Sequence, residues 1–173
     1  MTMKKVPTFL AFLLAAATLG AATPALAHVL QCVPYARAES GIPIHGNAAT
    51  WWSQAEGAYD RGQTPQVGAV LVFRSTAAMP YGHVAVIGKI VDERHVLLDH
   101  ANWSRPGMIE TAAMAEDVSE AGDWSDVRVW YDPIKGMGAR TNPTFGFIYA
   151  PGHESLSQTT LAKADESGEL AGD

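Results

Sequence analysis

The sequence predicts an α+β fold in which N-terminal helices pack on an antiparallel β-sheet. Segments with helical spacing come first, over residues 32–56, and apolar runs typical of strands follow from residue 67 onward. The polar link at residues 92–95 is short enough for a hairpin, which joins antiparallel neighbours. Helices that precede the strands, rather than alternating with them, favour α+β over a βαβ arrangement.

The first predicted helix spans residues 32–40. Pro34 is tolerated only in the first turn of a helix, where its missing N–H costs nothing. The helix should therefore begin at Cys32, and Gly41 should end it. This assignment places the thiol of Cys32 at a helix N-terminus.

The second predicted helix spans residues 47–56, with Asn47 as its candidate N-cap. Trp51 and Trp52 fall on the same side of this helix with Ala55. The two tryptophans could line a substrate groove, although packing in the core is the more common role for at least one of them.

Apolar runs predict the strands that follow. We place strands at residues 67–73, 83–91, 96–102, 126–132 and 145–150. The mixed segment 104–125 has no clear periodicity, and we assign no element to it.

The first 27 residues have the three parts of a secretory signal peptide. Lys4 and Lys5 form a positive start, an apolar run covers residues 9–19, and residues 25–27 (ALA) give a small-x-small cleavage pattern. The alternative is a membrane anchor, but the run is shorter than the roughly 20 apolar residues that span a bilayer. We expect an exported protein, periplasmic or secreted, without stable membrane insertion after the signal is removed.

The rest of the chain divides into a folded domain at residues 28–150 and a tail at residues 151–173. The tail is polar and acidic and has no aromatic residue, which is typical of a disordered segment. The whole chain is 47% hydrophobic and 17% charged, as expected for a chain with a folded core.

Charge and cysteine content exclude several classes of function. Lys plus Arg total 12 and Asp plus Glu total 18, so the formal net charge is −6. Such a balance argues against nucleic-acid binding, which requires a basic patch. The chain has one cysteine, which excludes an internal disulfide and any multi-cysteine metal cluster. No histidine pair has the context of a metal site, so we predict no metal and no cofactor.

Cys32 and His83 have the chemistry of a cysteine nucleophile and its base. An unpaired thiol in an exported protein is a liability unless it is used or hidden. The positive end of a helix lowers a thiol's pKa, so we expect this effect at Cys32. His83 begins an apolar strand and follows Gly82, and an imidazole there can accept the thiol proton.

A third polar residue should orient His83, and the hairpin register leaves two candidates. In the simplest register, Asn102 lies diagonal to His83 and His100 lies one pair further along. A bulge that shifts the register by two would place Asn102 opposite His83 and His100 diagonal to it. Asp99 lies on the other face of the sheet in both cases.

Four segments in order resemble the motifs of the CHAP family, the cysteine- and histidine-dependent amidohydrolases/peptidases. They are residues 31–37 (QCVPYAR), 65–73 (PQVGAVLVF), 82–87 (GHVAVI) and 99–103 (DHANW). The resemblance implies a papain-like α+β fold and the cleavage of amide bonds in peptidoglycan.

The resemblance also implies roles for individual residues. Cys32 would be the nucleophile and His83 the general base. Many members carry an acidic residue two positions before Asn102, where this chain has His100. The related NlpC-type cell-wall peptidases use a histidine as their third polar group, so both residues stay candidates. Gln31 could help to bind the oxyanion, by analogy with papain.

The sequence thus favours an exported peptidoglycan hydrolase, either an N-acetylmuramoyl-L-alanine amidase or a crosslink endopeptidase. The alternative is a non-catalytic domain of the same fold that binds the cell wall or acts as a scaffold. A third option is a cysteine peptidase or transglutaminase-type acyltransferase that acts on proteins.

Overall fold

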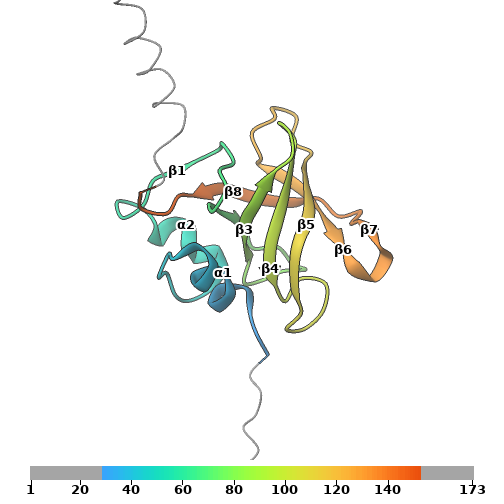
Figure 1. Cartoon of the computed structure of the whole chain (residues 1–173), viewed down its shortest axis with the longest axis horizontal. Helices are drawn as coiled ribbons and strands as arrows, with labels where there is room; N and C mark the ends of the chain where they lie inside the picture. Colours follow the sequence, from blue (N-terminus) through green and yellow to red (C-terminus); the bar gives the residue numbers. More distant parts are fainter. Residues whose placement is uncertain (1–28, 153–173) are drawn as a thin grey trace, which may run out of the picture.

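The computed structural model describes residues 29–152, so the predicted signal peptide and most of the predicted tail lie outside the described residues. The elements run from helices to strands along the chain (Figure 1). In chain order they are α1 (Cys32–Ser40), η1 (Ala48–Thr50), α2 (Trp51–Gln54), β1 (Arg61–Gly62), β2 (Val70–Phe73), β3 (His83–Ile90), β4 (His95–Ala101), β5 (Ile109–Asp117), β6 (Asp126–Tyr131), η2 (Asp132–Ile134), β7 (Gly136–Met137) and β8 (Asn142–Ile148).

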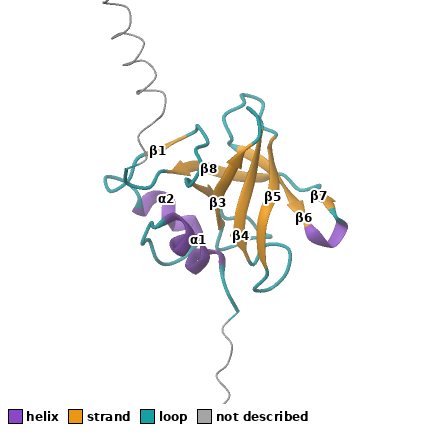
Figure 2. Cartoon of the chain, viewed as in Figure 1, coloured by secondary structure: helices purple, strands orange, loops and turns teal. Residues whose placement is uncertain are grey.

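The predicted fold class was wrong, because the strands form a closed barrel rather than an open sheet beneath a layer of helices. Antiparallel pairing runs in the order β8-β2-β3-β4-β5-β6, and β6 then pairs with β8, which closes a barrel of six strands. The closing contact pairs Asp126 with Pro143 and Val127 with Asn142. The described part of the chain has two short α-helices, which lie together on one side of the barrel (Figure 2). The papain-like α+β arrangement is therefore not the architecture of this chain.

Two features that local sequence patterns do not report produce the closure. Strand β5 lies within the segment 104–125, to which the sequence assigned no element, and it connects β4 to β6. The pairing of β6 with β8 joins segments that no hairpin connects. Because strands in a sheet twist progressively, a six-stranded antiparallel sheet can curl until its two edges meet.

Helix α1 has the predicted bounds, beginning at Cys32 and ending at Ser40. Pro34 lies in its first turn, and Gly41 ends it in the left-handed region at φ 70°. The N–H of Gly41 donates to the carbonyl of Arg37 at 3.1 Å, which satisfies one of the terminal carbonyls. The second predicted helix is shorter than expected and is divided into η1 and α2.

Strand β2 and the first five residues of β3 are buried on both faces, because one face lines the barrel and the other supports the helices. Alternate residues of β2 illustrate this: Leu71 and Phe73 belong to the cluster inside the barrel, whereas Val70 and Val72 pack with the helices. Trp51 is fully buried in this second cluster. The core role expected for at least one of the two tryptophans is thus confirmed.

The register between β3 and β4 is the shifted one of the two alternatives. Val86 pairs with Asp99 and Ile87 with Leu98, and a bulge at Gly88 changes the register nearer the hairpin turn. Continued toward the start of β3, this register places His100 diagonal to His83. The simplest register, in which His100 is one pair further away, was wrong.

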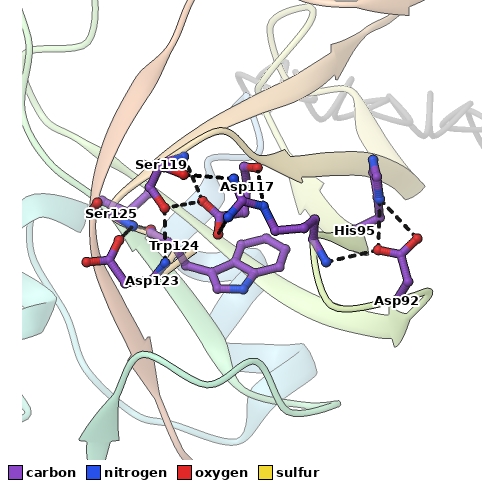
Figure 3. A network of polar contacts seen from close by, with 9 residues as sticks. Asp92, His95, Asp117, Ser119, Asp123, Trp124 and Ser125 are labelled. Atoms are coloured by element: carbon purple, nitrogen blue, oxygen red, sulfur yellow. Dashed lines mark hydrogen bonds and ion pairs between the residues drawn. The ribbon is translucent and has the colours of Figure 1, made fainter. Parts of the chain in front are cut away.

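A polar network at the end of the barrel away from His83 joins β5 to the loop before β6 (Figure 3). The buried carboxylate of Asp117 accepts hydrogen bonds from the N–H and the hydroxyl of Ser119 at 2.9 and 2.6 Å. Arg94 donates to the carbonyls of Asp117 and Ser119, and its guanidinium lies 3.5 Å from the Asp117 carboxylate. This network holds the connection that leads into the closing strands.

No helix within residues 29–152 is long and apolar enough to cross a membrane.

Candidate active site

Cys32 is half-buried at the first turn of α1 and lines a cleft of about 490 Å³. The cleft lies between the start of α1, the loop that precedes η1 and the turn that leads into β3. Its lining residues are Gln31, Cys32, Val33, Pro34, Arg37, His45, Gly46, Asn47, Ala48, Met79, Pro80, Tyr81, Gly82 and Asn102. The thiol therefore faces a space that a substrate can enter.

The pKa of Cys32 is raised above its ordinary value, because burial disfavours the thiolate. Backbone hydrogen bonds with Val84, Val33 and Cys32 itself lower the pKa, but by less than burial raises it. The expectation of a lowered thiol pKa was wrong for this reason. In the free protein, Cys32 is a neutral thiol at pH 7 that has backbone N–H groups of the helix start around it.

His83 begins β3, and its imidazole points into the barrel rather than onto the helix side. Its exposed fraction is 4%, and three aromatic rings surround it: Phe73 at 5.5 Å, His100 at 5.2 Å and Trp103 at 4.9 Å between ring centres. Burial, together with the neighbouring His100, lowers the pKa of His83 well below its ordinary value. The ring is therefore neutral at pH 7, as a general base must be.

His100 is the polar residue in contact with His83. The two rings approach through Nε2 of His83 and Nδ1 of His100 at 3.1 Å, which is a hydrogen-bond distance. His100 is fully buried, and burial lowers its pKa from 6.5 to about 4. The geometry thus brings His83 and His100 together as a pair of neutral imidazoles inside the barrel.

Asn102, the other candidate, contacts Gln31 instead of His83. Its side-chain amide donates to Oε1 of Gln31 at 2.8 Å, and its Oδ1 accepts the N–H of Gly107 at 2.9 Å. Its backbone is in the left-handed region at φ 63°, which asparagine tolerates better than most residues. Asn102 therefore connects the end of β4 to the residue before Cys32.

The relation between Cys32 and His83 is indirect in the described residues. No hydrogen bond joins the two side chains there, and the sulfur instead has a backbone hydrogen bond with Val84. Both neighbours of His83 border the thiol side, since Gly82 lines the cleft and Val84 contacts Cys32. The catalytic roles of Cys32, His83, His100, Asn102 and Gln31 accordingly stay predictions.

Two residues of this region were missed as site residues by sequence reasoning. Glu110 of β5 is buried with an exposed fraction of 8%, and its Oε2 lies 3.8 Å from Nε2 of His100. It falls in the segment to which no element was assigned, and no local motif marks it. Arg37 also lines the cleft, and its Nε is buried without a hydrogen-bond partner among the described residues.

Comparison with known proteins confirms the family resemblance. The family model of the CHAP domain matches residues 23–102, a segment that includes Cys32, His83 and His100. This segment is therefore similar to the CHAP domain. CHAP domains are typically hydrolases, and their function is of the peptidoglycan-hydrolase type or related to it. No curated protein matches the chain.

Proposed function

We propose that this protein is an exported peptidoglycan hydrolase that cleaves amide bonds with Cys32 as nucleophile and His83 as base. The observation that carries the proposal is the contact between the neutral rings of His83 and His100. Gly82, the residue before His83, lines the cleft that exposes Cys32. A neutral imidazole held by a second polar group is the arrangement that activates a thiol.

The proposed reaction starts from a neutral thiol and a neutral imidazole. When substrate displaces water from the cleft, His83 takes the thiol proton, and the thiolate attacks the amide carbonyl carbon. The imidazolium then gives that proton to the leaving amine, which leaves a thioester on Cys32. Water, deprotonated by His83, attacks the thioester and releases the carboxylic acid and the free thiol.

Backbone groups at the start of α1 support the charge that develops in this reaction. The N–H groups of Cys32 and Val33 already surround the sulfur, and such groups stabilise an oxyanion as well as a thiolate. The amide of Gln31 also borders the cleft, and Asn102 fixes its orientation through the 2.8 Å hydrogen bond. Gln31 and Asn102 thus act on the oxyanion side of the proposed site.

The charge of the cleft favours an acidic substrate. Arg37 and His45 line it, and no carboxylate does so among the described residues. Arg37 has a buried Nε without a partner, and a substrate carboxylate would supply one. Peptide stems of peptidoglycan carry such carboxylates, so this feature supports a cut within or next to the stem, by an endopeptidase or an N-acetylmuramoyl-L-alanine amidase. The predicted signal peptide supports action in the periplasm or outside the cell.

A non-catalytic wall-binding or scaffold role is the second candidate. The raised thiol pKa and the lack of a Cys32–His83 hydrogen bond in the described residues favour this reading. Purified sacculi distinguish the two, with released muropeptides identified by mass spectrometry. We expect wild type to release products and Cys32→Ala to release none while still binding sacculi. Binding without release by wild type would overturn the hydrolase and support the scaffold.

A further inference from the structure

Glu110 has all the features of a group that is held in place to act on His100. Its Oε1 accepts the hydroxyl proton of Ser104 at 2.6 Å, and its Oε2 accepts the N–H of Ser104 at 2.9 Å. The hydroxyl oxygen of Ser104 in turn accepts the N–H of Asp132 at 3.0 Å. Because that oxygen already accepts a hydrogen bond, its own proton is directed to Glu110. Both carboxylate oxygens of Glu110 are therefore acceptors.

The nearest polar atom of His100 faces this carboxylate. Nε2 of His100 lies 3.8 Å from Oε2 of Glu110, and this nitrogen is buried without a hydrogen-bond partner among the described residues. Two acceptors that face each other in a buried site would repel. The favourable arrangement has the proton of the neutral His100 ring on Nε2, directed to the carboxylate.

The position of the proton on His100 determines the position of the proton on His83. With Nε2 of His100 protonated, Nδ1 is a bare acceptor, and the 3.1 Å contact requires Nε2 of His83 to donate to it. The single proton of neutral His83 is then on Nε2, which leaves its Nδ1 free to accept a proton. Only this tautomer gives His83 a basic nitrogen outside the His83–His100 contact.

We propose that Glu110 is a positioning residue that fixes the tautomers of His100 and His83, so that Nδ1 of His83 is the base for the Cys32 thiol. The use of this base rests on the proposed hydrolase function, whereas the tautomers themselves do not. Glu110 touches neither the thiol nor the cleft among the described residues, and acts through His100. Its negative charge also stabilises the imidazolium that forms when His83 takes the thiol proton.

The tautomers can be read directly by NMR on the uniformly ¹⁵N-labelled chain, because protonated and bare ring nitrogens have different ¹⁵N shifts. We expect both His83 and His100 of the wild type to carry the proton on Nε2 at pH 7. A proton on Nδ1 of His100 would overturn the proposal. This measurement needs no variant and no activity, so it stands apart from the fate of the hydrolase proposal.

The variant Glu110→Gln tests the cause. A glutamine can direct its NH₂ group to Nε2 of His100, so we expect the His100 tautomer to change or become mixed. Glu116→Gln, which neutralises a half-buried carboxylate on the same strand that pairs with Arg128, should leave both tautomers unchanged. An unaltered His100 tautomer in a folded Glu110→Gln protein would refute the role of Glu110.

Activity on sacculi gives a separate result. We expect Glu110→Gln to lower kcat on the order of 10–100-fold with KM nearly unchanged, as for other groups that orient an imidazole from behind. A fall in kcat with both tautomers intact would count against the proposal. If the wild type releases no product while its tautomers are as stated, the hydrolase proposal fails and the positioning role of Glu110 remains.

Discussion

Acid should destabilise the protein in a pH range set by its buried histidines. The unfolded chain protonates His100 near its ordinary pKa of 6.5, whereas the folded chain resists protonation until about pH 4. The stability that comes from the neutral ring is present above pH 6.5 and is lost as the pH falls toward 4. Each pKa unit corresponds to about 1.4 kcal/mol, so His100 alone accounts for about 3 kcal/mol of lost stability. His83 has a lowered pKa as well and acts in the same direction.

Urea denaturation from pH 7 to pH 4 measures this loss. The carboxylates with lowered pKa values do not confuse the result, because those of Asp92, Asp123 and Asp132 are depressed from 3.8 and act at lower pH. The variant His100→Gln cannot titrate, so its free energy of unfolding should fall about 3 kcal/mol less than that of wild type over this range. Equal pH dependence in the two proteins would refute the reasoning, whatever their stability at pH 7.

Three further predictions concern the cleft. The thiol of Cys32 should react slowly with iodoacetamide at pH 7 and faster as the pH rises past 9.0, since its pKa is raised; fast labelling at pH 6 would contradict this. Gly82→Ala should lower the free energy of unfolding by at least about 1–2 kcal/mol, measured by thermal or urea denaturation. The reason is that φ is 67° at Gly82 and that an added Cβ would lie 2.7 Å from the carbonyl oxygen of Phe73. Unchanged stability would disprove this prediction. Arg37→Gln should raise KM on sacculi about 10-fold or more with little effect on kcat. The control variant Lys89→Gln, at an exposed position, should leave KM unchanged. Equal KM values for Arg37→Gln and wild type would argue against carboxylate binding by Arg37.

Local sequence patterns located the elements that carry the site better than they located the whole fold. Helix α1 has the expected bounds because Pro34 and Gly41 restrict where a helix can begin and end. Strand β3 starts at His83, as its apolar run predicts. The barrel was not predictable from such patterns, because its closure depends on the contact of β6 with β8 across a connection that is not a hairpin.

The contact of His83 with His100 was one of the alternatives that the sequence offered, whereas the electrostatics of the candidate site were not predicted. The shifted register brings His100 diagonal to His83, and their rings are in contact. Asn102 would lie opposite His83 in this register, but its backbone is left-handed and its side chain contacts Gln31 instead. The raised thiol pKa could not be anticipated, because the helix N-terminus is visible in the sequence and the burial of the sulfur is not. Glu110 reaches the site only through the pairing of β4 with β5.

Strand β8, the last strand of the barrel, determines when the two histidines can be buried during synthesis of the chain. Its residues 142–148 pair with both β2 and β6, yet they lie some 40 residues beyond the family match that ends at residue 102. A chain truncated at residue 102 would leave His83 and His100 exposed to water. The chain must therefore be synthesised through β8 before His83 and His100 can be buried. A recombinant version that lacks β8 should have solvated, more basic imidazoles.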